Sequence, residues 1–182
     1  MVDLGRGTDL RPCEPSDDAF LYDVFCTTWE SEVAALPNKN LAQHILRIQH
    51  IAQERRFAHR YPGHERLVVR VAGQRAGRLY LFETQASLQI VDLTLLPQFH
   101  SRGIGTRILQ HLMSEATRDG STIALGVPRT NKRATRLCAA LGFELVSVDD
   151  LENGFEWAPT PVNGTLAPTP AVDAVSRPGS RR

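Results

Sequence analysis

The chain has 182 residues, of which 42% are hydrophobic and 23% charged, and its formal net charge at pH 7 is +1. This length suits one domain with a substantial core, and the small net charge gives no sign of a nucleic-acid-coating surface. No apolar run approaches the roughly 20 residues that span a bilayer, and the N-terminus lacks the core of a signal peptide. The sequence therefore predicts a cytoplasmic protein with neither nucleic acid nor membrane as a partner, and Cys13, Cys26 and Cys138 are expected to be reduced thiols.

The first third of the chain predicts one short strand and two helices. The strand covers residues 9–13, and Pro15-Ser16-Asp17-Asp18 then predicts the start of a helix that runs to about residue 36. A second helix is expected over 41–58, between Pro37 and Pro62-Gly63.

The middle and the end of the domain predict a larger set of alternating elements. Three β-like runs are followed by a helix, a strand, a second helix and a final hairpin with a long loop. In chain order these are strands 66–71, 77–82 and 88–96, helix 103–118, strand 122–127, helix 130–141, and strands 143–148 and 154–157.

The composition changes at the end of the chain. Residues 158–182 hold five of the 11 prolines, together with alanine, threonine, serine and glycine. Such a segment cannot bury a core. The sequence therefore predicts one domain over residues 1–158 and a disordered tail over 159–182.

A glycine-containing turn joins the strand that ends before Pro97 to the helix that follows. Gly103 and Gly105 stand at the start of that helix, where free N–H groups and the helix dipole favour an anion. No lysine follows Gly105, which excludes a P-loop, and Ile108 occupies the third glycine position of a dinucleotide fingerprint. The turn alone is compatible with a phosphate cradle and with a purely structural role.

A second pattern is found in residues 131–143. Asn131, Ala134, Leu137 and Gly142-Phe143 stand at fixed spacing, and they follow the earlier stretch His100-Ser-Arg-Gly103-Ile-Gly105. Together the two stretches resemble the GCN5-related N-acetyltransferase (GNAT) family, over about residues 8–158. The resemblance implies an α/β fold with a mixed, mostly antiparallel sheet flanked by helices, and acetyl-CoA as co-substrate.

The resemblance also implies which residues bind that co-substrate. The backbone of Leu93 and Leu95 is expected to pair with the pantetheine arm, with the Leu93 N–H polarising the thioester carbonyl, and Asn131 to hydrogen-bond the arm. The pyrophosphate is expected in the turn formed by His100, Ser101, Arg102, Gly103, Ile104, Gly105 and Thr106. Two positions depart from the family pattern: His100 replaces an arginine or glutamine, and Cys138 replaces the tyrosine that acts as general acid.

The expected acceptor is a primary amine of a small molecule or peptide. A primary amine is mostly protonated at pH 7, so a base or a water path is required. Asp92 is the first candidate for the proton-accepting or amine-binding carboxylate, and Glu83 is the second. Glu30 and Glu32 are weaker candidates, and Gln89 occupies a position at which some family members carry a glutamate.

Other readings stay open at this point. The histidines show no metal-like clustering, so no metal is expected. A non-catalytic acyl-CoA sensor or assembly module would fit the turn equally well, and a toxin-like enzyme that acetylates charged tRNA is disfavoured by the net charge. A homodimer is compatible with the sequence.

Overall fold

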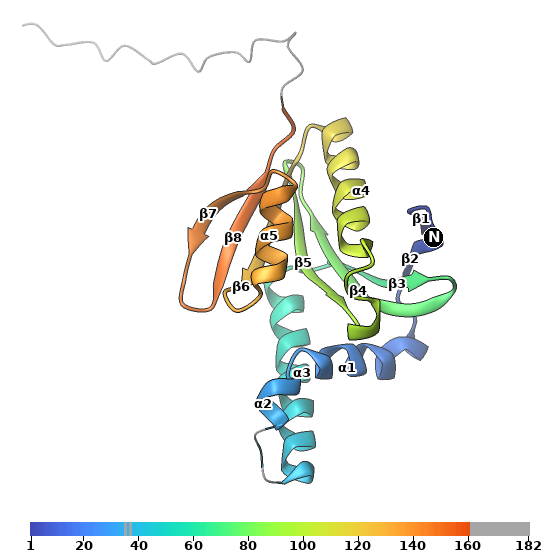
Figure 1. Cartoon of the computed structure of the whole chain (residues 1–182), viewed down its shortest axis with the longest axis vertical. Helices are drawn as coiled ribbons and strands as arrows, with labels where there is room; N and C mark the ends of the chain where they lie inside the picture. Colours follow the sequence, from blue (N-terminus) through green and yellow to red (C-terminus); the bar gives the residue numbers. More distant parts are fainter. Residues whose placement is uncertain (35, 37, 161–182) are drawn as a thin grey trace, which may run out of the picture.

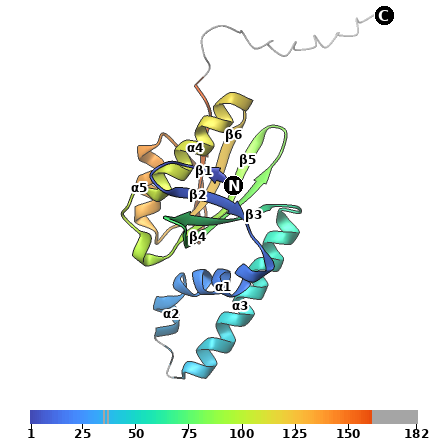
Figure 2. The same cartoon turned by 90° about the vertical axis from the view of Figure 1, so that its right-hand side faces the viewer.

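A computed structural model of the chain describes residues 1–34, 36 and 38–160 and shows a β-sheet with helices on both faces (Figures 1 and 2). In chain order the elements are β1 (Val2–Asp3), β2 (Thr8–Pro12), η1 (Pro15–Asp17), α1 (Asp18–Thr27), α2 (Glu30–Ala34), α3 (Lys39–Arg60), β3 (Glu65–Val71), β4 (Gln74–Glu83), β5 (Ser87–Leu95), η2 (Pro97–Phe99), α4 (Ile104–Asp119), β6 (Thr122–Pro128), α5 (Lys132–Ala140), β7 (Glu144–Val148) and β8 (Glu152–Trp157).

The sheet has eight strands in the order β1-β2-β3-β4-β5-β6-β8-β7. All neighbouring strands are antiparallel except β5 and β6, which run parallel. The predicted mixed, mostly antiparallel sheet with flanking helices is therefore confirmed.

Side-chain alternation assigns the helices to opposite faces of the sheet. On β3, Val69 belongs to the core that contains α4, whereas the adjacent Val68 packs with Phe20, Leu21 and Val24 of α1. Successive strand residues point to opposite faces, so α4 and α1 cover different sides. Figure 2 shows α1, α2 and α3 grouped on one side of the sheet and α4 and α5 on the other.

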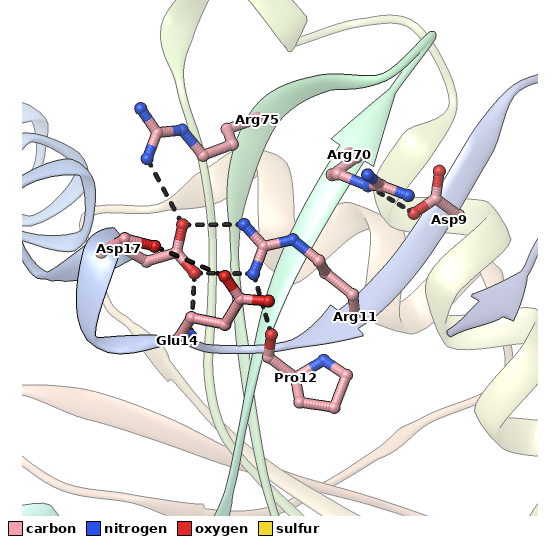
Figure 3. A network of polar contacts seen from close by, with 8 residues as sticks. Asp9, Arg11, Pro12, Glu14, Asp17, Arg70 and Arg75 are labelled. Carbon is pink, nitrogen blue, oxygen red and sulfur yellow. Dashed lines mark hydrogen bonds and ion pairs between the residues drawn. The ribbon is translucent and has the colours of Figure 1, made fainter.

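A buried carboxylate joins the start of α1 to the sheet (Figure 3). Asp17 is 1% exposed; it accepts two hydrogen bonds from Arg11 at 2.6 and 2.8 Å, one from Arg75 at 3.3 Å, and one from the Glu14 N–H at 2.9 Å. The hydrogen bonds from Arg11 are the largest of the influences that hold the pKa of Asp17 well below its usual range. The network connects β2, η1 and β4.

Three details differ from the prediction. The helix expected to run to residue 36 is divided into α1 and α2, because the hydroxyls of Thr27 and Thr28 bond back to the carbonyls of Val24 and Phe25 and compete with helix continuation. The long loop expected before the last strand is only the short connection 149–151, and β1 was not predicted. The predicted tail lies outside the described residues from 161 onward.

Candidate functional site

The turn before α4 presents a row of free backbone donors. Ser101 and Gly103 have positive φ values of 60° and 71°, and the first backbone bond of the helix runs from the Arg107 N–H to the Gly103 carbonyl. Among the described residues, the N–H groups of positions 101–106 have no backbone acceptor. A left-handed turn with consecutive free N–H groups at a helix N-terminus is an anion-binding concavity.

The side chains around this turn leave its mouth open. A Cβ on Gly103 would meet no atom within 4 Å, whereas a Cβ on Gly105 would lie 3.5 Å from Leu137 of α5. A Cβ at position 105 would therefore make ordinary contact with α5. The side chain of Ile104 is 2% exposed and belongs to the core, so this residue offers the site only its N–H.

Two arginines flank the turn. Arg102 lies over the ring of Phe99 at 5.5 Å, and the Arg107 guanidinium reaches the Arg102 carbonyl at 3.4 Å. The Nε of Arg107 is buried without a partner in the described part of the chain. The two arginines place positive charge beside the turn, and Arg107 is hydrogen-bonded to its backbone.

The strand before the turn has an unpaired edge. β5 pairs with β6 only from Ser87 to Ile90, although β5 continues to Leu95. The Leu96 N–H bonds to the Ala76 carbonyl on the β4 side, so by alternation the backbone groups of Leu93 and Leu95 point to the β6 side. The structure therefore exposes the predicted pair of residues on the open edge.

The ring of His100 connects this edge to the turn. Its Nε2 lies 2.8 Å from the Leu95 carbonyl, so the ring donates to that oxygen in the tautomer that carries the proton there. One of the two predicted backbone partners is thus already occupied on its carbonyl side. The Leu93 groups and the Leu95 N–H are what the edge offers a ligand.

The second motif lies on α5. The Asn131 side-chain oxygen caps this helix by accepting the Ala134 N–H at 3.0 Å, which leaves its amide NH₂ for a ligand. Cys138 is 2% exposed within the main core, and burial raises the pKa of its thiol to about 11. The Cys138 side chain is therefore part of the hydrophobic core.

A cavity of about 580 Å³ opens beside the gap between β5 and β6. The C-terminal part of α3 forms one wall, and the β7–β8 hairpin forms the other. Its lining includes Arg56, Phe57, Arg60, Tyr61, Gln89, Val91, Ala124, Gly126, Val146, Ser147, Asp149, Leu151, Glu152, Gly154 and Glu156.

The strand residues at the bottom of this cavity include the small residues Ala124, Gly126 and Gly154, which leave space above the sheet. A Cβ on Gly126 of β6 would lie only 2.6 Å from a carboxylate oxygen of Glu152, so the Glu152 carboxylate lies directly over that glycine. Glycine within a strand marks a close approach. The absence of a side chain at Gly126 thereby leaves room for the carboxylate beside the strand that borders the gap.

Asp92, the first predicted catalytic carboxylate, is engaged in a buried ion pair. One oxygen lies 2.5 Å from an Arg78 nitrogen, and the other accepts the Thr94 hydroxyl at 2.6 Å. Arg78 is 1% exposed and also approaches Glu54 of α3 at 3.6 Å. Burial is the largest single influence on the pKa of Arg78 and would lower it, but the charges of Asp92, Tyr80 and Glu54 together with the hydrogen bond to Asp92 raise it overall.

The other predicted carboxylates lie elsewhere. Glu83 ends β4 opposite Leu88 and lines a separate cavity of about 560 Å³ beside the C-terminal part of α4. Glu30 and Glu32 belong to α2. The structure therefore does not bring Glu83 together with Asp92, and neither lines the cavity beside Gln89.

Sequence reasoning missed the charged lining of that cavity. Arg56 lies in the helix predicted over 41–58, Arg60 lies just beyond it, and Glu152 lies in the loop expected between the strands 143–148 and 154–157; none of them was singled out. The one available signal was Gly126 inside a strand pattern, which indicates close approach of another group.

Two further properties concern the described residues. They contain no group of three or more His, Cys, Asp and Glu side chains arranged to hold a metal. None of the described helices is long and apolar enough to cross a membrane.

Comparison with known proteins identifies a family that matches most of the domain. A family model described as the acetyltransferase (GNAT) family matches residues 21–143. A comparison with curated proteins gives no match.

Solved structures with the same fold include PaiA N-acetyltransferase from Thermoplasma acidophilum in complex with coenzyme A, at 16% identity and a TM-score of 0.61 over 83% of this chain and 98% of that one. The ribosomal L7/L12 α-N-protein acetyltransferase RimL in complex with coenzyme A has 16% identity and a TM-score of 0.61, over 87% and 97% of the two chains. For yncA from Salmonella typhimurium with acetyl-CoA the values are 16% and 0.52, over 91% and 99%. These likenesses show the fold, and the family model, which matches more than half of the chain, shows that the chain belongs to the acetyltransferase (GNAT) family.

Proposed function

We propose that the protein is an acetyl-CoA-dependent N-acetyltransferase that acetylates a primary amine of a small molecule or peptide by direct attack. The observation that carries this proposal is the row of unpaired N–H groups at 101–106, next to the unpaired edge of β5. The solved relatives hold coenzyme A or acetyl-CoA, which supports the same ligand here.

The residues present fit this co-substrate. The backbone donors at 101–106 suit a pyrophosphate, because Gly103 has no Cβ to obstruct its approach. The positive charges of Arg102 and Arg107 beside the turn suit the charge of that group. The pantetheine amides require an open strand edge, and the Leu93 backbone supplies one. The bound thioester supplies the acetyl group, whose carbonyl carbon bonds to the amine nitrogen as the carbon–sulfur bond breaks.

The chain must also manage the proton of the amine. Deprotonating a primary amine at pH 7 costs roughly 4–5 kcal/mol. Gln89, in the cavity beside the gap, cannot accept a proton. Asp92 and Glu83 stay candidates for this role; Asp92 would have to give up a bond from Arg78 or Thr94 to perform it, and Glu83 would have to act from another cavity.

In the family's sequence pattern, Cys138 stands at the position of the tyrosine that protonates the leaving thiolate. A buried thiol with a pKa of about 11 is a weak donor at pH 7. A free thiol has a pKa near 8.5, so at pH 7 the released thiolate can take its proton from solvent without a side-chain acid.

Calorimetry on two glycine variants tests the cradle. Gly103→Val should weaken coenzyme A binding at least tenfold, an estimate based on the loss of charge-assisted hydrogen bonds of about 1.5–3 kcal/mol. Gly120→Val is the matched control, because Gly120 ends the same helix with φ of 66° and equally open surroundings. Gly105→Val is less clean because it also presses on Leu137.

Equal affinity of the Gly103→Val and Gly120→Val variants for coenzyme A would contradict the proposal that the turn binds the pyrophosphate. A non-catalytic acyl-CoA sensor would show the same binding pattern, and only turnover separates it from the proposed enzyme.

A further inference from the structure

The cavity beside the β5–β6 gap has two walls of opposite charge. Arg56 and Arg60 stand on α3, and Glu152 and Glu156 stand on β8. No ion pair links these side chains to each other or to any other residue in the described part of the chain. These four exposed side chains therefore line opposite walls of the cavity with no ion-pair partner among the described residues.

Each wall is electrostatically unfavourable on its own. Arg56 and Arg60 are four residues apart on one helix, a spacing at which like charges repel. On the other wall, Glu156 of β8 stands directly opposite Glu144 of β7 in the register, and like charges in that relation are destabilising. A ligand with both a cationic and an anionic group would relieve both walls at once.

The surroundings of Arg60 and Glu152 leave both charged groups free to bind a ligand. The Arg60 guanidinium lies 5.5 Å above the ring of Tyr61, which itself packs on Phe82, and a stacked guanidinium keeps its N–H fork free. The Glu152 carboxylate lies over Gly126 at the border of the gap.

Asp149 also lines the cavity, but its side chain is bonded within the hairpin turn. The side chain of Asp149 accepts the N–H groups of Glu152 and Leu151, and these bonds hold its pKa below the usual range. Asp149 is thus committed to the hairpin turn.

We propose that the acceptor is a small molecule that carries an anionic group as well as the amine, with Arg56 and Arg60 binding the anion and Glu152 and Glu156 facing the ammonium. This inference rests on the proposed function, because it names the acceptor class of the same site. A volume of about 580 Å³ lies within the usual range of small-molecule pockets. The anion is a carboxylate or a phosphate, and the test distinguishes the two.

The test compares amines that differ only in the anion. One series pairs natural amino acids with their amides and their decarboxylated amines, and a second pairs O-phosphoethanolamine with ethanolamine. Binding to the protein saturated with coenzyme A is measured by calorimetry, and acetyl transfer by thiol release. At least one anion-bearing amine should bind about tenfold or more tightly than its partner that lacks the anion, and the series in which this occurs identifies carboxylate or phosphate.

Variants of the charged residues test whether the two walls of the cavity cause the preference for an anion-bearing amine. Arg56→Gln and Arg60→Gln should each reduce the affinity ratio between the anion-bearing amine and its partner. Arg55→Gln should preserve the ratio, because this exposed arginine is adjacent on α3 but does not line the cavity. Glu152→Gln should weaken binding of the ammonium in both members of a pair, whereas Asp150→Asn, an exposed loop change outside the lining, should not.

The outcomes separate this inference from the proposed function. If no anion-bearing amine is preferred, or if Arg55→Gln changes the ratio as much as Arg56→Gln, the inference is wrong even where transfer occurs. If the preference exists and depends on Arg56 and Arg60 but no amine releases the thiol, the inference stands as a ligand preference and the transferase is wrong.

Discussion

At the scale of single residues, the pair formed by Arg78 and Asp92 decides how the carboxylate on β5 can act. The Arg78 side chain is 1% exposed, and its short contact to Asp92 is the closest of its ionic contacts. A buried pair of this kind adds little net stability compared with apolar side chains, but removing one partner is costly. We therefore expect Asp92 to stabilise the fold, whether or not it also takes part in proton transfer.

Replacing Asp92 with Asn keeps the shape and removes the charge. In the described part of the chain, the remaining partners of Arg78 are then Glu54 at 3.6 Å, the amide oxygen of Gln53 at 3.0 Å and the ring of Tyr80 at 5.2 Å. We expect the free energy of unfolding to fall by about 3–5 kcal/mol, measured by urea denaturation. Below the melting temperature, kcat/KM of the folded variant should fall by less than tenfold.

A different result would assign Asp92 another role. A loss of about 10²–10⁴-fold in kcat/KM in a variant that remains folded is the effect expected from removing a general base. Glu83→Gln is the parallel change, and a loss in that range there would move the proton acceptor to the other cavity.

At the scale of elements, the Asp17 network holds α1 against the sheet. Arg11 of β2 and Arg75 of β4 both converge on this carboxylate (Figure 3). α1 packs against α3, where the rings of Tyr22 and His50 lie 5.4 Å apart, and α3 forms one wall of the cavity. The network therefore helps to set where that wall stands.

This network makes stability depend on pH. The folded-state pKa of Asp17 is lowered, so its contribution is fully present above the ordinary pKa near 3.9 and is lost as the pH falls from there through the lower folded value. Asp17→Asn should lower the free energy of unfolding by about 2–4 kcal/mol at pH 7. The variant should then lose less stability than the parent protein between pH 7 and pH 3.

Asp18→Asn is the control for this effect, because Asp18 is the exposed neighbour at the start of α1. An equal pH dependence in the parent protein and the Asp17→Asn variant would show that other carboxylates carry the acid sensitivity.

Most elements could be predicted because they follow from local periodicity. The helix of α4 has an apolar stripe at Ile104, Ile108 and Leu112, and all three are buried. The break after α1 was missed because it depends on the hydroxyls of Thr27 and Thr28 bonding back to the helix rather than on hydrophobic spacing.

At the scale of the whole molecule, the site depends on contacts between distant segments. The turn at 101–106 could be predicted, since its residues are consecutive. The opening of β5 and β6 beyond Ile90 and Leu125 depends on where a parallel pairing stops, and the Glu152 carboxylate over Gly126 depends on the register of β8 against β6. Neither property is encoded in a local pattern.

The arrangement places two different ligand surfaces around one gap in the sheet. α4 and α3 lie on opposite sides of the sheet (Figures 1 and 2). The free N–H groups precede α4, whereas α3 borders the charged cavity. A thioester that follows the open edge of β5 would meet an amine in the cavity. This geometry suits transfer between two bound molecules better than storage of one.

Turnover with acetyl-CoA and the amine series tests the transferase most directly. The protein should release free thiol only when an amine is present, with an equal amount of acetylated amine detected by mass spectrometry. Gly103→Val should reduce both signals together at limiting acetyl-CoA, while Gly120→Val should retain them. Normal coenzyme A binding without amine-dependent release of thiol, across the whole series, would contradict the transferase and identify the domain as an acyl-CoA-binding module.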